Sequence, residues 1–452
     1  MAKDMTMGNP LKLILFFSIP VFLGSLFQQF YSMIDTFIVG RYISENALAA
    51  VGASGAIVFL VLGFAFGITQ GFGVVIAKIY GAKDFQKLKH FVAMSMELTI
   101  FVSIFLTAIF AGQSMNLLKL MNTPSNIIDA ANTYVLIIYF GIIVTMLYNA
   151  CASILRGIGD SKTPLYFLIF SSFLNIVFDL IFILKFDLNV AGAAYATILT
   201  QGIAAIISLV YSFTKYEFLR PQLSDFYFDF SAYLQLLKVG LSMAMNYSII
   251  AIGVMFLQSG VNHFGSSAVA AFTAASKVEN FGTLAMPALG AGAATYIAQN
   301  LGAQKYQRIV DGMKKTLFMG FFITIFSILF YAFLSKTIVK LFIPEITNET
   351  MVFATSYLYT SAWFLPFLQA IFIFRNALQA IGNQIIPVIS GIVELAFRYL
   401  SINLLLIPYG YWAIRLAEPS AWFGAGVLTI IYYYRWEKKL KIKIKSLNNN
   451  IS

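Results

Sequence analysis

The chain has 452 residues, of which 60% are apolar and 11% charged, and its formal net charge is +11. Soluble domains carry about 25% charged residues, so this composition excludes a water-soluble globular protein. The single cysteine, Cys151, excludes an internal disulfide and a cysteine metal cluster, and His90 and His263 stand alone without metal-ligand spacing.

Long apolar segments recur along the whole chain. A bilayer core of about 30 Å requires roughly 20 apolar residues of helix to cross it. The first segment is too long for a signal peptide and contains Pro20, Gln28 and Gln29, so we interpret it as a spanning helix. The sequence predicts an all-α membrane protein of twelve transmembrane helices, at 11–34, 46–77, 98–118, 130–155, 163–184, 188–214, 239–262, 280–304, 316–335, 351–374, 386–407 and 412–434.

Lysine and arginine are distributed unevenly between the loops. With a cytoplasmic N-terminus, the outer loops hold only Arg41, Lys119, Lys185, Lys336 and Lys340, and most of the others lie inside. This bias predicts a multi-pass protein of the cell (inner or plasma) membrane with both termini in the cytoplasm. It also explains the net charge without a nucleic-acid partner. The basic stretch from Arg435 to Lys445 is expected to lie against anionic lipid headgroups.

An internal repeat divides the chain into two halves. Residues 47–50 and 76–82 return as 268–271 and 297–303 at an offset of 221, and Leu155, Gly159 and Pro164 match Leu378, Gly382 and Pro387 at an offset of 223. Because each half holds six helices, the two repeats are parallel, and substrate sites of such transporters lie between the halves. We therefore expect an N-lobe at 1–213, a cytoplasmic linker at 214–230, a C-lobe at 231–435 and a basic cytoplasmic tail at 436–452.

Several of the predicted helices contain glycine or proline. Gly63, Gly67 and Gly71 form a ladder of small residues on one face of the second helix. Such ladders serve close helix packing in membranes, and a role in helix bending is an equal alternative. Pro20 and Pro287 are expected to interrupt the first and eighth helices.

Few carboxylates fall inside the predicted helices of the first half. Inserting a carboxylate near the bilayer centre is unfavourable by roughly 2.5 to 3.5 kcal/mol. Each carboxylate at that depth is therefore expected to have a structural or functional role. Asp35 ends the first helix, and Asp179 follows Asn175 by four residues on one helical face. With oxygens from Asn149 and Thr197, these residues form a set suited to a proton or to Na⁺, the only metal we expect. The alternative to an ion site is that Asp35 only caps a helix at the membrane interface and that Asp179 is only satisfied by hydrogen bonds.

Charged residues in the second half have local partners. Glu394 and Arg398 are four apart, Arg415 and Glu418 are three apart, and we interpret both as structural ion pairs. Glu279 has no helical partner at such a spacing, so it is a candidate to meet a substrate cation. Lys277, Glu279 and Arg398 make up a second, weaker candidate polar site in the C-lobe.

Sequence motifs of known catalytic or nucleotide-binding sites are missing. The chain contains no phosphate-binding loop for ATP, no nucleophile elbow and no His-Glu-x-x-His pattern. These absences predict a non-enzymatic protein without a cofactor. Transport without ATP requires an ion gradient, which supplies about 2.3 kcal/mol per charge per 100 mV.

The whole chain resembles the multidrug and toxic compound extrusion (MATE) family of the MOP flippase superfamily. The resemblance is carried by Met33–Arg41, by Arg156-Gly-Ile-Gly-Asp160 with Pro164, by Asn175-x-x-x-Asp179, by Val190–Ala194 and by Gln299–Ala303. It implies two six-helix lobes that form a V. It also implies a monomeric antiporter that exports organic, often cationic, drugs or toxic compounds while protons or Na⁺ enter.

The resemblance also implies positions for the coupling site. The family's N-lobe site falls on Asp35, Asn149, Asn175, Asp179 and Thr197, and because the second lobe holds only Glu279 among the acids used by other members, we favour coupling in the N-lobe. The alternative within transport is a lipid-linked oligosaccharide flippase of the same superfamily, which would carry a more basic central cavity. A membrane enzyme or a passive receptor is a third class that the repeat disfavours.

Overall fold

The computed structural model describes residues 2–343 and 347–449, and all secondary structure in these two ranges is helical, which confirms the all-α prediction. The chain divides into two compact units. Unit 1 comprises Met1–Asp4 and Leu23–Ser248, and unit 2 comprises Met5–Phe22 and Ile249–Ser452. Two long helices, α1 (Pro10–Tyr42) and α8 (Phe230–Asn262), contribute residues to both units.

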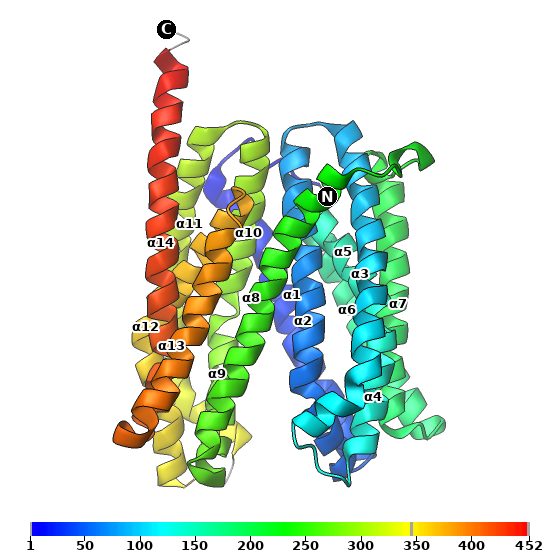
Figure 1. Ribbon diagram of the computed structural model, residues 1–452, viewed down its shortest axis with the longest axis vertical. Helices are drawn as coiled ribbons and strands as arrows, with labels where there is room; N and C mark the ends of the chain where they lie inside the picture. Colours follow the sequence, from blue (N-terminus) through cyan, green and yellow to red (C-terminus); the bar gives the residue numbers. More distant parts are fainter. Residues whose placement is uncertain (1, 344–346, 450–452) are drawn as a thin grey trace. The chain divides into compact units, whose positions relative to one another are not determined.

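The remaining helices belong to one unit each (Figure 1). Unit 1 contains α2 (Glu45–Gly81), α3 (Phe85–Leu120), α4 (Ile128–Phe140), α5 (Ile142–Gly157), α6 (Lys162–Leu180), the π-helix η1 (Ile181–Lys185), α7 (Asn189–Lys215) and the short 3-10 helices η2 (Glu217–Leu219) and η3 (Leu223–Asp225). Unit 2 contains α9 (Gly265–Thr283), α10 (Ala285–Gly302), α11 (Tyr306–Phe342), α12 (Asn348–Ala380), α13 (Ile385–Tyr409) and α14 (Trp412–Asn449).

Ten helical stretches in the described ranges are long and apolar enough to cross a membrane, and α4 with α5 adds an eleventh if this bent pair forms one span. The stretch Gly265–Gly302 counts as one of the ten although it breaks between α9 and α10. Helix α14 contains the predicted segment 412–434 but is not among them. It continues to Asn449, so the predicted tail is helical there, and residues 450–452 of that tail lie outside the described residues.

Helix ends and turns follow local sequence signals. Ser44 caps α2 by accepting a hydrogen bond from the Ala47 nitrogen over 3.1 Å, and Asp84 caps α3 in the same way.

Turns that correspond in the internal repeat share their backbone conformation. Gly159 and Gly382, 223 residues apart, have φ of +86° and +95°. Such angles favour glycine because it has no Cβ.

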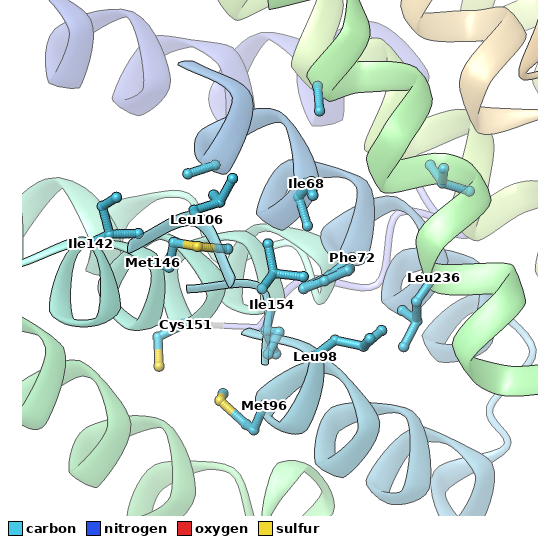
Figure 2. Packing of buried hydrophobic residues seen from close by; sticks show 14 of the residues in the cluster. Ile68, Phe72, Met96, Leu98, Leu106, Ile142, Met146, Cys151, Ile154 and Leu236 are labelled. Atoms are coloured by element: carbon cyan, nitrogen blue, oxygen red, sulfur yellow. The ribbon is translucent and has the colours of Figure 1, made fainter. Parts of the chain in front are cut away.

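The core of unit 1 forms where α2, α3 and α5 pack together. Ile68 and Phe72 of α2, Leu98 of α3 and Ile154 of α5 are buried there, and Cys151 is buried as a free thiol (Figure 2). The glycine ladder of α2 serves a different contact, with α8. A Cβ on Gly71 would lie 2.4 Å from the backbone nitrogen of Gly240 in α8, and one on Gly67 would lie 2.5 Å from the Cα of Ala244. The structure thus favours the packing role of the ladder.

The breaks within helices differ from those predicted. Helix α1 continues through Pro20, so the predicted interruption there is wrong. Pro287 is the third residue of α10, where the missing N–H costs no helical hydrogen bond, and the break lies just before it at Leu284. A bend of 48° at Gly141 separates α4 from α5. That bend was not predicted, since an isolated glycine in a helical pattern rarely marks a break.

Candidate ion-binding site

Three helices of unit 1 bring four of the five predicted polar residues together. Helix α1 carries Asp35, α6 carries Asn175 and Asp179, and α7 carries Thr197. The spacing of four residues in α6 places the amide and the carboxyl on one face, as predicted. Asp179 is fully buried and Asn175 is 2% exposed, so both side chains face the interior of the unit.

The carboxyl groups of Asp35 and Asp179 lie within hydrogen-bonding distance of each other. One oxygen of each, Oδ1, is buried and accepts no hydrogen bond from the residues that the structure describes. Two ionised carboxylates have no proton to donate, so a direct hydrogen bond between them requires a proton on one. The pair therefore has the geometry of a shared-proton site, in which like charges cannot both ionise cheaply.

The Asn175 amide supports this pair from the side. With its nitrogen oriented toward Asp179, the amide donates to Asp179 Oδ2 over 2.8 Å and to the Tyr31 hydroxyl oxygen over 3.3 Å. Its oxygen accepts a hydrogen bond from the main-chain nitrogen of Thr197 over 3.1 Å. The amide thus fixes the position of Asp179 relative to α7, and it favours the ionised form of that carboxyl because it donates to it.

Two tyrosines at the site were not predicted. Tyr31 lies one turn before Asp35 in α1, and Tyr134 comes from α4; both hydroxyls are close enough to interact electrostatically with the two carboxyls. The spacing of four residues between Tyr31 and Asp35 is a signal that the sequence offers. Nothing comparable marks Tyr134, because its approach depends on how α4 packs.

Asn149 of α5 is half-buried, but in the described ranges no hydrogen bond joins its side chain to the four predicted partners. The structure therefore does not bring Asn149 into hydrogen-bonding contact with the rest of the predicted site. Immediately after Asp179 the backbone changes from α to π hydrogen bonding at η1. This π-helix forms the end of the α6 stretch, before the loop that leads to α7.

The predicted residues of the second half gather in unit 2. Arg398 of α13 donates to Glu418 of α14 over 2.7 Å and lies 3.8 Å from Glu394, so the pairing of Glu394 with Arg398 is present but is the longer of the two. Glu394 also pairs with Arg375 of α12. Lys277 and Glu279 lie on α9, where Lys277 is exposed and Glu279 is half-buried.

The predicted pair of Arg415 with Glu418 is wrong. Arg415 instead donates from Nε and a terminal nitrogen to the Thr360 hydroxyl, over 3.0 and 2.8 Å, and its guanidinium lies 3.7 Å from the centre of the Trp412 ring. Stacking on an aromatic face and a hydroxyl acceptor satisfy an arginine without an acid. Glu418 is consequently free to bind Arg398.

Among the described residues, no group of three or more histidine, cysteine or acidic side chains has the geometry to hold a metal ion. The candidate site offers the carboxyls of Asp35 and Asp179, the Asn175 amide and the hydroxyls of Thr197, Tyr31 and Tyr134. This set can bind a proton, and its hard oxygen donors are also of the kind that suits Na⁺.

Comparisons with known proteins agree on one family. The family model described as MatE matches residues 20–181 and 240–408. The chain is 30% identical over 428 residues to "Probable multidrug resistance protein YpnP" of Bacillus subtilis (strain 168), a match that covers 94% of this chain and 91% of the relative. It is 25% identical over 442 residues to "Probable multidrug resistance protein NorM" of Thermotoga maritima, covering 93% of this chain and 92% of the relative.

Solved structures share the fold. One is described as the outward-facing conformation of a multidrug resistance MATE family transporter of the MOP superfamily. It has a TM-score of 0.89 and 22% sequence identity, and the match covers 97% of this chain and 98% of the other. Because the family model and the curated relatives each match most of its length, this chain belongs to the MATE family.

Proposed function

We propose that this chain is an ion-coupled antiporter that exports organic, often cationic, drugs or toxic compounds while H⁺ or Na⁺ moves in the opposite direction. As a member of the MATE family it is a transporter and not an enzyme. Its relatives carry names such as multidrug resistance protein and multidrug export protein, which supports small-molecule drugs as substrates.

The contact between Asp35 and Asp179 is the observation that carries this proposal. A buried pair of acids on different helices holds together when it contains a proton or a small cation, and repels when both groups are ionised and bare. Binding and release of the ion therefore change the free energy of packing α1 against α6. A ligand shifts a conformational equilibrium by its differential affinity for the two states. Through this coupling the gradient of the ion can drive export.

The same proposal includes the finer architecture. We place twelve spans in two parallel six-helix repeats that form a V, with an N-lobe at 1–213, a linker at 214–230, a C-lobe at 231–435 and a tail at 436–452. The matching φ angles of Lys83 and Gln304, 60° and 57° at an offset of 221, support two repeats of one design. Both termini are proposed to be cytoplasmic and the protein monomeric, with the basic tail at anionic lipids.

A reconstituted transport assay tests the proposed function. Purified full-length protein in liposomes is supplied with a fluorescent organic cation, and pH and Na⁺ gradients are imposed separately. We expect substrate to move only under the gradient of the coupling ion. Asp35→Asn and Asp179→Asn should each abolish this movement. The matched control is Asp187→Asn, because Asp187 is exposed in the loop after η1.

Unchanged transport in both Asp35→Asn and Asp179→Asn would remove the proposed coupling site. Movement of the cation without either gradient would remove ion coupling altogether. Movement of a lipid-linked oligosaccharide, but of no drug, would support the flippase alternative.

A further inference from the structure

A histidine of α3 contacts the connecting segment, residues 216–229, which joins α7 to α8. His90 lies in the second turn of α3, and its side chain is 6% exposed. Its Nδ1 atom lies 2.8 Å from the main-chain oxygen of Asp225, and its Nε2 atom lies 3.4 Å from Asp229 Oδ2. Its ring stacks on that of Tyr227, with 4.0 Å between the ring centres and 5° between the planes. Both nitrogens and one ring face of His90 therefore meet the connecting segment.

Asp229 extends this contact to the start of α8. Its Oδ1 atom accepts hydrogen bonds from the nitrogens of Ser231 and Ala232, over 2.9 and 3.1 Å, so Asp229 caps the first turn of that helix. The hydrogen bond from Ala232, together with His90 and the Ser231 nitrogen, outweighs partial burial and holds the pKa of Asp229 below its ordinary value. Asp229 is therefore a carboxylate at neutral pH, and its second oxygen faces the imidazole ring.

The two acceptors around His90 indicate how many protons its ring carries. A neutral imidazole has one N–H group and one bare nitrogen. In either tautomer the bare nitrogen would face an oxygen that also has only lone pairs to offer, either the Asp225 carbonyl or the Asp229 carboxylate. An imidazolium has an N–H group for each. At 3.4 Å Nε2 makes no regular hydrogen bond in the described ranges, so Asp229 acts on it through its charge. The face of Tyr227 also attracts a cation.

The other charged groups near His90 do not take the place of Asp229. They are Lys87 and Lys89 of α3, Glu97 two turns further along that helix, and the Asp225 carboxylate. Lys87 is exposed, and neither lysine forms an ion pair with an acid in the described parts of the chain. Glu97 accepts a hydrogen bond from α8, and the Asp225 carboxylate accepts one from a main-chain nitrogen of its own turn over 2.7 Å. The charge that acts directly on the ring is therefore that of Asp229.

We propose that His90 is a pH-sensitive fastener, which as an imidazolium holds the connecting segment and the capped start of α8 against α3. Loss of one proton removes the charge that attracts Asp229 and turns a bare nitrogen toward an oxygen. The contact is therefore strong at low pH and weakens as the pH rises. Histidine suits this role because it ordinarily changes its charge between about pH 5 and 8. The inference does not depend on the proposed antiport, since neither Asp35 nor Asp179 takes part in the contact.

The chain has only two histidines, so the protonation of His90 can be measured directly. Solid-state NMR of the full-length protein in lipid vesicles, with ¹⁵N in the histidine rings, distinguishes an imidazolium from a neutral ring. His263 is exposed and serves as the internal reference, and His263→Gln assigns the signals. We expect His90 to keep both ring protons to a higher pH than His263. This difference should be lost in Asp229→Asn, which can still cap α8, and retained in the control Glu217→Gln, exposed in η2.

Amide exchange of residues 222–232 tests whether the proton fastens the segment. After correction for the intrinsic effect of pH, exchange should become about tenfold faster or more once His90 is neutral, which is the scale of one charge-assisted hydrogen bond. His90→Phe keeps a ring for Tyr227 but has no proton to lose, so its exchange should be fast throughout. The step should persist in Asp35→Asn/Asp179→Asn, whatever happens to transport. A His90 ring that loses its proton no later than His263, or an equal step in His90→Phe, would overturn the proposal.

Discussion

Tyr216 donates its hydroxyl proton to Asp160 Oδ2 over 2.7 Å, and the same hydroxyl oxygen accepts a hydrogen bond from the Ala2 nitrogen over 2.8 Å. Asp160 also accepts from the nitrogen and the hydroxyl of Thr163, and the Lys3 nitrogen donates to the Ile158 oxygen. Tyr216 thereby fastens the start of the chain to the loop between α5 and α6.

Tyr216→Phe should release this start of the chain. The variant leaves a buried carboxylate one donor short, which costs about 1–3 kcal/mol. We expect a lower melting temperature of the purified protein and faster amide exchange at Ala2 and Lys3. Tyr166→Phe is the control, since Tyr166 is 62% exposed. Equal exchange in both variants would show that other contacts hold the segment.

Stability should depend on pH through Asp160. Burial alone would raise the pKa of Asp160, but hydrogen bonds from Thr163 and Tyr216 outweigh burial and hold the pKa below its ordinary value. A depressed pKa contributes stability that is present above the unfolded value of about 3.9 and is lost as the pH falls through the folded value. The difference in melting temperature between wild type and Asp160→Asn should therefore be constant from about pH 7 to 5 and should shrink only below about pH 4. A difference that already vanishes near pH 6 would contradict this assignment.

Asn175→Leu should change the pH dependence of transport while leaving substrate recognition intact. The amide donates to Asp179 and so favours its ionised form. Hydrogen bonds to charged groups contribute about 1.5–3 kcal/mol, which corresponds to about one to two pH units. Transport activity measured against pH in liposomes should move toward higher pH by this amount. An unshifted pH profile would mean that the Asn175 amide does not affect binding of the coupling ion.

The glycine ladder of α2 offers a packing test. Gly71→Ala places a Cβ against the backbone of Gly240, and overpacking of this kind costs about 1–3 kcal/mol. Gly52→Ala in the same helix is the matched control, because no atom lies within 4 Å of its new Cβ. Thermal unfolding should show a loss for Gly71→Ala and no loss for Gly52→Ala. Similar melting temperatures would mean that α8 moves aside at little cost.

The pair of Arg398 and Glu418 can be tested with a double-mutant cycle. Removing one partner of a buried pair is destabilising by about 3–5 kcal/mol because it strands a charge, whereas removing both costs much less. Arg398→Gln and Glu418→Gln should each lower the melting temperature strongly, and the double variant should recover a large part of the loss. Additive losses would indicate that the two side chains act independently.

Local spacing and apolar context account for most of what the sequence predicts correctly. Asp179 stands out as a carboxylate within an apolar run, and the spacing of four residues joins it to Asn175 without knowledge of the fold. The long apolar runs predict the helices because a membrane leaves the backbone no other way to satisfy its hydrogen bonds.

Contacts between distant helices could not be predicted in this way. Glu418 is three residues from Arg415 but binds Arg398, which is 20 residues away. Tyr134 reaches the acid pair only because α4 packs beside it. Pro20 fails to break α1 because tertiary packing can outweigh the loss of one backbone hydrogen bond. In each of these cases the outcome depends on neighbours that are remote in sequence.

The π-helix η1 has a consequence for the segment that connects Asp179 to α7. Each hydrogen bond in a π-turn spans one residue more than in an α-helix. These five residues therefore contain one residue more than a regular α-helical turn would need. Drawing that residue into regular α-helix would advance the chain by about 1.5 Å and rotate it by about 100°. Because η1 follows Asp179, a single local exchange of hydrogen bonds there can shift the loop that leads into α7 while the turn of α6 that carries Asp179 stays whole.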